Sequence, residues 1–129
     1  MSGNIAYPQT NPDNNTGTTN QTITVTNTGN TAIDAEISGD VMCLIYPSCS
    51  TSFFGPSQQR FGASNVTYAS LANLLSATAT PATIQINLAK PTSTTTPVTI
   101  DLFWGIAIPV GKAVGTYTGQ NIFTAVANI

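Results

Sequence analysis

Hydrophobic and polar residues alternate along five stretches of the chain, a pattern typical of β-strands that bury one face. The stretches are residues 21–30, 31–39, 82–90, 97–109 and 116–129. In the first, Ile23 and Val25 alternate with threonines, and a glycine-containing turn leads into the second. We therefore expect these two strands to form a hairpin. The stretch 97–109 is long enough for a central strand and places Trp104 on its apolar face.

The segments between these stretches have less regular patterns. Residues 40–45 form a compact apolar run that predicts a buried strand, and residues 65–68 fit a short strand. Residues 46–64 lack a period and predict a long loop, whereas residues 70–78 have a faintly helical spacing over too few residues for a stable helix. The sequence therefore predicts an all-β fold, an Ig-like or jelly-roll-type antiparallel β-sandwich of about seven or eight strands.

The N-terminal residues differ from the rest of the chain in composition. A length of 129 residues predicts one domain, in which residues 1–20 are a tail or a donor strand with its linker and residues 21–129 form the β-sandwich. The apolar cluster of the first part is Ile5, Ala6 and Tyr7. This segment is long enough to act as a donor strand for a neighbouring subunit. An ordinary first strand of its own sheet and a free tail are the alternatives.

Charged residues are scarce. Asp, Glu, Lys and Arg make up 6% of the chain, against about 25% in ordinary soluble domains. The basic residues Arg60, Lys90 and Lys112 are too few for a nucleic-acid partner or for a polybasic membrane contact. No apolar stretch is long enough to span a bilayer. Because such a chain has weak electrostatic self-repulsion, we expect an exported protein, extracellular or on the cell surface.

The side chains that carry most enzyme chemistry are missing. The sequence has no histidine and two cysteines, which excludes a Ser-His-Asp triad, a Cys-His pair and the usual zinc sites. An enzyme would need a carboxylate pair, such as Asp34 with Glu36 or Asp101, as acid and base. We therefore expect no enzymatic activity, no catalytic residue and no cofactor.

Two kinds of covalent modification suit an exported chain. Cys43 and Cys49 are close enough in sequence for a short-loop disulfide, with two reduced, buried thiols as the alternative. Glycosylation sequons occur at Asn14, Asn20 and Asn65, at the frequency that composition alone gives. The disulfide would fix a local loop, and glycans would lie on the surface.

Two further sites have weaker support. Asp34, Glu36 and Asp40 would supply oxygen ligands for Ca²⁺, although the sequence lacks a calcium-loop motif and solvated carboxylates are the favoured interpretation. Lys90 and Lys112 are candidates for an isopeptide bond, which needs a desolvated, neutral amine. Both lysines flank proline or glycine in connecting segments, where a solvated ammonium is the ordinary state.

Aromatic residues suggest one alternative function. Trp104, Tyr117 and Tyr68 would together make a platform on which a sugar ring stacks, as in a carbohydrate-binding or adhesive module. The favoured interpretation is that Trp104 fills the core, because it lies on the apolar face of the longest predicted strand.

Three phrases of the chain resemble a known kind of module. They are TNTGNTAIDAEISG, SQQRFG and LFWGIAIPVGKAVGTYTGQNIFTAVA, which together span about residues 21–127. They are similar to Ig-like β-sandwich modules of large exported surface proteins of archaea and bacteria, in which the third phrase is a terminal hairpin. The resemblance implies an extracellular, non-enzymatic module of a filament, surface layer or adhesin, and it brings no catalytic residues.

These observations predict a structural subunit. The expected protein assembles with copies of itself into an extracellular, pilus-like filament or a surface layer, by β-strand addition of the segment around Ile5, Ala6 and Tyr7. Scarce lysines leave sheet edges without their usual protection against pairing, which favours assembly. A secreted carbohydrate-binding or adhesive β-sandwich module is the alternative.

Overall fold

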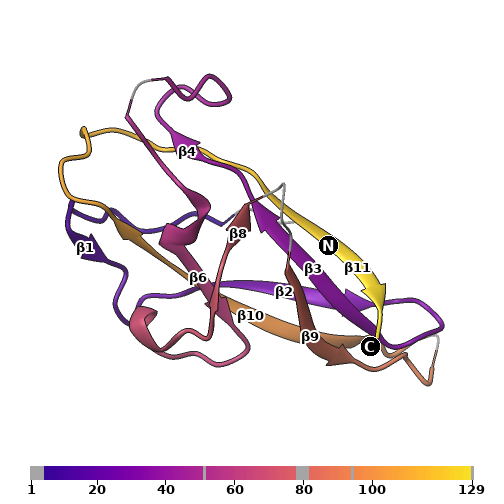
Figure 1. The fold of residues 1–129 in the computed structure, drawn as a ribbon. Helices are drawn as coiled ribbons and strands as arrows, with labels where there is room; N and C mark the ends of the chain where they lie inside the picture. The colour runs from indigo at the N-terminus through magenta and orange to yellow at the C-terminus, as the bar shows by residue number, and fades with distance from the viewer. Residues whose placement is uncertain (1–4, 51, 78–81, 94, 129) are drawn as a thin grey trace.

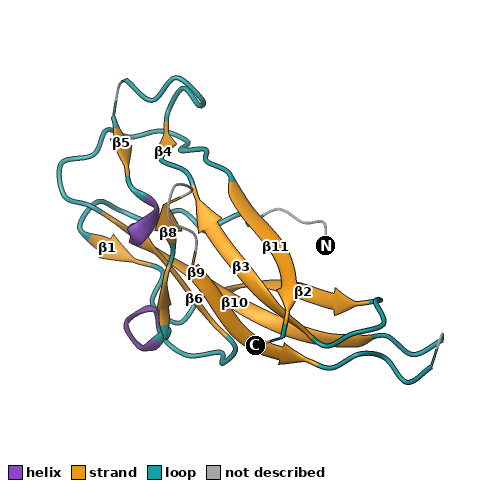
Figure 2. Ribbon diagram, turned by 45° about the vertical axis from the view of Figure 1, so that its right-hand side comes forward, coloured by secondary structure: helices purple, strands orange, loops and turns teal. Residues whose placement is uncertain are grey.

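The chain folds into two facing β-sheets with a small third sheet at one end (Figures 1 and 2). The computed structural model describes residues 5–50, 52–77, 82–93 and 95–128. The strands are β1 (Asn14–Asn15), β2 (Gln21–Asn27), β3 (Ile33–Gly39), β4 (Met42–Cys43), β5 (Phe53–Phe54), β6 (Gln59–Gly62), β7 (Asn73–Leu74), β8 (Ser76–Ala77), β9 (Ala82–Leu88), β10 (Val98–Ile108) and β11 (Asn121–Ala127). Two 3₁₀ turns, η1 (Pro56–Gln58) and η2 (Tyr68–Ser70), flank β6 and β7. The predicted all-β sandwich fold is confirmed.

The first sheet is built around β10, the longest strand. β10 pairs antiparallel with β2 on one side and with β6 on the other, and β7 extends the sheet beyond β6. In this register Leu102 lies opposite Ile23, and Trp104 lies opposite Phe61. The alternation of β10 therefore places its apolar side chains on the face that covers the second sheet.

The second sheet is built around β3. β11 pairs antiparallel with β3 along its whole length, and β9 pairs with its other side, where the register shifts between Ile33 and Ala35. The short strand β8 runs parallel to the end of β3. Ala35 and Ile37 are buried and face the first sheet, as their alternation predicts.

The core lies between the two sheets and centres on an aromatic cluster. Trp104 has no exposed surface, and its ring stacks on Phe61 with 4.7 Å between the ring centres. The Phe123 ring of β11 lies 5.6 Å from Trp104, so the cluster joins both sheets. Trp104 thus fills the core, which is the favoured interpretation of the sequence.

Two predicted hairpins are wrong. β2 pairs with β10, whereas β3 pairs with β11 and β9, so consecutive strands β2 and β3 lie in different sheets. The same is true of β10 and β11, which the resemblance to known modules joins as a terminal hairpin. Alternation identifies which face of a strand is buried, but it does not identify the strand's partner. The glycine-containing connections cross from one sheet to the other.

Short elements also differ from their predictions. The predicted loop 46–64 contains β6, an internal strand of the first sheet, because four residues give too little alternation to detect. The predicted strand 40–45 is reduced to the two residues of β4. Residues 65–68 form no strand and lead into η2, and residues 70–78 contain β7 and β8 where a faint helical spacing occurs.

The N-terminal linker is shorter than predicted, because residues 14–17 belong to the sandwich. β1 pairs with the end of β10, Asn14 lying opposite Ile108. The buried hydroxyl of Thr16 accepts the Ile106 amide at 3.1 Å, and the Gly17 carbonyl accepts the Tyr68 amide at 2.8 Å. These hydrogen bonds tie the chain to β10 and to η2 before the first long strand begins.

Replacing the Thr16 hydroxyl tests this attachment. Thr16→Val leaves the buried Ile106 amide without its acceptor, so we expect the free energy of unfolding to fall by about 1–3 kcal/mol. Thr18→Val is the matched control, because Thr18 is exposed, and it should change stability by less than about 0.5 kcal/mol. Urea unfolding followed by tryptophan fluorescence measures both. Equal stability of the two variants contradicts the assignment.

Candidate functional site

An open groove lies between one edge strand of each sheet. Its volume is about 520 Å³, and it runs between β2 of the first sheet and β11 of the second. The lining residues are Val25, Thr26, Ile33, Asp34, Ala35, Ile86, Gln120, Asn121, Ile122, Phe123, Thr124 and Ala125. Of these, Asp34 alone is charged, so the groove is predominantly apolar with polar side chains at its rim.

The groove exists because the core-facing side chains of the two edge strands are less buried at positions further from Trp104. On β2, Ile23 is buried, but Val25, two residues further on the same face, is only half-buried. On β11, Phe123 is half-buried and packs on the core, whereas Ala125 on the same face is exposed. The sandwich is therefore closed around the aromatic cluster and open beside it.

Some backbone groups of β11 face away from β3 at the groove. Among the described residues, β11 pairs with β3 alone. The Asp40 amide donates to Gln120 at 2.8 Å, and the Asn128 amide donates to Ala32 at 3.2 Å. Because hydrogen-bonded pairs alternate along an antiparallel ladder, the N–H and C=O groups of Phe123 and Ala125 point away from β3. They lie on the open edge of the sheet.

The predicted donor-strand residues are linked to this groove through Gln59. Ile5 and Tyr7 pack against the core of their own chain, whereas Ala6 between them is exposed, and none of the three belongs to a strand. The Tyr7 hydroxyl donates to Gln59 Oε1 at 2.8 Å, and the Asn121 side chain donates to the same oxygen at 3.1 Å. Gln59 therefore links the segment to the residue at which β11 begins. Burial, reinforced by the nearby Tyr68 hydroxyl, raises the pKa of Tyr7 far above its ordinary value.

Gln59 and Asn121 are site residues that sequence reasoning missed. Gln59 is 2% exposed and lies on β6, a strand that the sequence pattern does not reveal. Asn121 is the first residue of β11 and is half-buried next to Gln59. Because Gln59 lies in a segment without a hydrophobic period, the sequence alone does not indicate that it is buried or which residues it bonds to.

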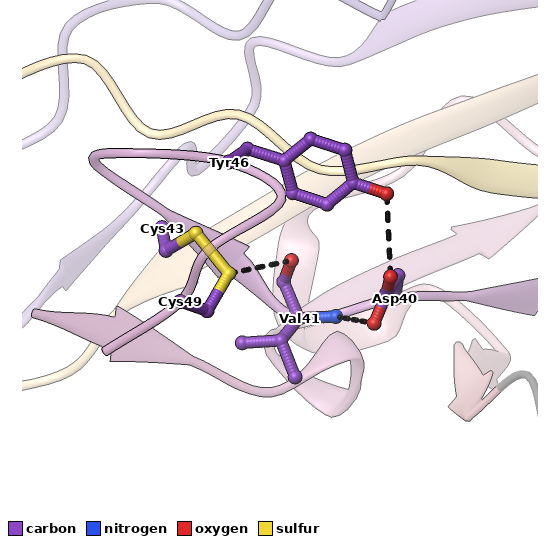
Figure 3. The surroundings of a disulfide bond; sticks show 5 residues. All are labelled: Asp40, Val41, Cys43, Tyr46 and Cys49. Atoms are coloured by element: carbon purple, nitrogen blue, oxygen red, sulfur yellow. Dashed lines mark hydrogen bonds between the residues drawn. A yellow bond between two sulfur atoms is a disulfide. The ribbon is translucent and has the colours of Figure 1, made fainter. Parts of the chain in front are cut away.

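The predicted disulfide is confirmed (Figure 3), and it fixes a loop beside β4 at one end of the molecule (Figure 1). Cys43 on β4 is fully buried and is bonded to Cys49. Within the loop, Asp40 accepts the Val41 amide at 2.7 Å and the Tyr46 hydroxyl at 3.2 Å (Figure 3). Cys43 also exchanges two backbone hydrogen bonds with Thr118, which ties the loop to the connection between β10 and β11.

The candidate carboxylates have separate surroundings. Asp34 is fully buried and accepts the Asn87 backbone amide at 2.9 Å, while Asp40 bonds within the disulfide loop. Asp101 lies on the other sheet and accepts the Thr24 hydroxyl at 2.7 Å. In the part of the chain that the structure describes, no three acidic or cysteine side chains gather closely enough to hold a metal ion. The structure thus does not bring Asp34, Glu36 and Asp40 together as a calcium site.

The lysines and sequon asparagines are at the surface. Lys90 is exposed, and the Lys112 ammonium donates to the Phe53 carbonyl, so neither has the desolvated surroundings that an isopeptide bond needs. The side chains of Asn14 and Asn65 are exposed. The Asn20 amide donates to Asn65 at 2.8 Å and to the Val66 carbonyl at 2.6 Å, so its nitrogen is engaged in the folded chain.

The three candidate aromatic residues do not share a surface. Trp104 and Tyr68 are buried, and Tyr117 is half-buried against Phe54 with 5.0 Å between the ring centres. The Tyr117 hydroxyl donates to the Ala113 carbonyl at 2.9 Å. A sugar ring therefore has no stacking platform made of Trp104, Tyr117 and Tyr68.

No protein-family model, curated protein or solved structure matches the chain. The resemblance to Ig-like modules of exported surface proteins therefore stays a prediction, and the functional argument rests on the groove and its surroundings. Across the described residues, the structure has no helix with the length and apolar character needed to cross a membrane.

Removing the disulfide tests its local role. The bond closes a loop of sequence separation six, for which the chain-entropy relation gives about 2 kcal/mol. We expect a Cys43→Ala/Cys49→Ala variant to lose about that much stability while keeping the sheets, because the loop lies outside both of them. Urea unfolding and amide hydrogen exchange measure the two effects. Loss of protection in β10 and β3 contradicts a local role.

The buried Tyr7 phenol makes stability depend on alkaline pH. Folding raises the pKa of Tyr7 above the unfolded value of 10.0. The buried neutral phenol therefore contributes fully to the free energy of unfolding below that pH, and this contribution is lost as the pH rises above it. We expect the unfolding free energy to fall above pH 10 by up to about 1.4 kcal/mol per pH unit. Tyr7→Phe should make this decline shallower. Urea unfolding across this pH range decides, and an unchanged slope in the variant contradicts the burial of Tyr7.

Proposed function

We propose that the chain is a structural subunit of an extracellular filament, a pilus-like fibre, or of a surface layer. Subunits join head to tail when the N-terminal segment of one adds as a β-strand to the next. One observation carries this proposal: an apolar groove lies open beside β11, which among the described residues pairs on one side only, and the segment Ile5–Tyr7 belongs to neither sheet.

The β11 edge supports assembly because it lacks the features that normally prevent pairing. Soluble proteins protect sheet edges with lysines, prolines or inward-pointing charges. β11 has the sequence NIFTAVA, which contains none of these. An uncharged edge with free N–H and C=O groups is a template for another strand, and β-strand addition uses it without exposing new apolar surface.

A second surface suits contact between successive subunits. Large hydrophobic side chains are exposed on the disulfide loop, on β5 and on the connection between β10 and β11, at the end of the molecule away from the C-terminus (Figure 1). They are Ile45, Phe53, Val110 and Val114, of which Val114 is 97% exposed. An exposed apolar group of this kind marks an interaction surface in a soluble protein.

An extracellular location is consistent with the covalent chemistry. The disulfide between Cys43 and Cys49 persists in oxidising compartments, and the structure has no free cysteine among the described residues. A head-to-tail contact that does not close on itself produces an open fibre, which an exported subunit forms after it leaves the cell.

Electron microscopy tests the proposed function. We expect concentrated wild-type protein to form long fibres in negative stain, and an Ile5→Asp/Tyr7→Asp variant to stay monomeric, because a charge in an apolar groove is costly. Ala6→Asp is the matched control, because Ala6 is exposed between the two apolar residues; it should still form fibres. Discrete wild-type monomers at every concentration overturn the proposal, and glycan binding by those monomers would favour the adhesive alternative.

A further inference from the structure

We infer that the acceptor for strand addition is the groove between β2 and β11, and that its occupant is the N-terminal segment of a second copy of this chain. The incoming segment lies alongside β11 and inserts its apolar side chains between the two sheets. This inference rests on the proposed function, which the groove beside β11 supports, and it adds which strands form the acceptor and how the segment binds there. Other sheet edges, at β2, β7 and β9, are the competing locations.

The backbone of β11 has N–H and C=O groups that point toward the position of an added strand. The ladder between β3 and β11 continues into hydrogen bonds from Asp40 to Gln120 and from Asn128 to Ala32. Its alternation directs the N–H and C=O groups of Phe123 and Ala125 to the open side. An added strand would satisfy these groups while leaving every hydrogen bond to β3 in place.

The side chains of the groove match those of the segment. Residues two apart on an extended chain face the same way, and Ile5 and Tyr7 are both turned toward apolar surroundings in their own chain, with Ala6 exposed between them. The groove offers the half-buried side chains of Val25 and Ile86 and the exposed Ala125. Burying this apolar surface in the complex favours association.

Charge and size also favour a strand of this chain. The segment IAYPQTNP, residues 5–12, carries no charge. The one charged lining residue, Asp34, is fully buried and accepts the Asn87 amide. At roughly 30 Å³ for each water molecule in the liquid, the 520 Å³ groove has room for much more than a few ordered waters. An uncharged, amphipathic strand therefore fits better than a charged peptide.

The position of a subunit's own segment supports an exchange between copies. Ile5 and Tyr7 contact the same core cluster as Val25, Ile86 and Phe123, and Tyr7 shares the Gln59 oxygen with Asn121 at the start of β11. Because the neighbour's segment is identical, its Ile5 and Tyr7 would again be buried against apolar residues, so the exchange costs little. The irregular residues 8–13 link the segment to β1 and would let it reach a neighbour.

A proline on the open edge tests the acceptor. Ala125→Pro removes an N–H that points away from β3, so the subunit keeps its ladder, and proline is tolerated on edge strands in this orientation. We expect this variant to fold but its subunit association constant to fall roughly tenfold or more, measured by sedimentation and electron microscopy. Far-UV circular dichroism and urea unfolding of the monomer check that it folds.

Filling the groove gives a second test that does not alter the backbone. Ala125→Phe places a ring in the groove and should block strand addition while leaving the monomer as stable as wild type or more so. Thr99→Phe is the matched control, because Thr99 is exposed on the outer face of the central strand β10 and is not among the residues that line the groove. It should assemble like wild type.

The outcomes separate the two proposals. Fibres from wild type and Thr99→Phe, with loss of fibres in folded Ala125→Phe or Ala125→Pro, support the β2–β11 groove as acceptor. Fibres of unchanged length from both Ala125 variants overturn the acceptor while the filament function stands. Discrete dimers, as from direct pairing of two β11 edges, overturn the N-terminal occupant. No fibres from wild type overturn the filament function, and the acceptor with it.

Discussion

The packing of Trp104 between Phe61 and Phe123 is the interaction on which the rest of the structure depends. Trp104 belongs to the central strand of one sheet and Phe123 to an edge strand of the other, so this cluster sets how the two sheets face each other. Large aromatic side chains bury more surface than any others and dominate core energetics. The Trp104 Nε1 group is nevertheless buried without a hydrogen-bond acceptor among the described residues. The cluster is therefore held by ring packing and apolar burial.

An uneven core has consequences at the edges of the sandwich. Close to Trp104, both sheets are covered by each other's side chains. Further along β2 and β11, Val25 and Ala125 face inward but keep exposed surface. In a closed sandwich, another strand would fill this space and pair with the edge of β11. The N-terminal segment is the part of the described chain that we propose for this position in a neighbouring subunit. If copies assemble as proposed, the segment of one subunit would fill the groove of the next, and only the last groove would stay empty.

Much of the fold was predictable from sequence. The strands β2, β3, β9, β10 and β11 follow the alternation of apolar and polar residues, because a half-buried strand imposes a period of two on its sequence. Cys43 and Cys49 are close in sequence, so their pairing was also predictable. The partners of the strands were not, because an alternating strand has the same pattern whichever sheet it joins. β6 escaped detection for a related reason, since its four residues are too few for a period.

The sequence alone determined the all-β class, the inward faces of the long strands, the disulfide and the scarcity of charge that leaves the edges unprotected. Each of these depends on local spacing or on composition. Tertiary structure alone decided which strands are edges, that the two edges beside the groove belong to different sheets, and that Tyr7 meets Asn121 at Gln59. These features depend on residues far apart in sequence, whose proximity follows from how the sheets pack and not from any pattern within one segment.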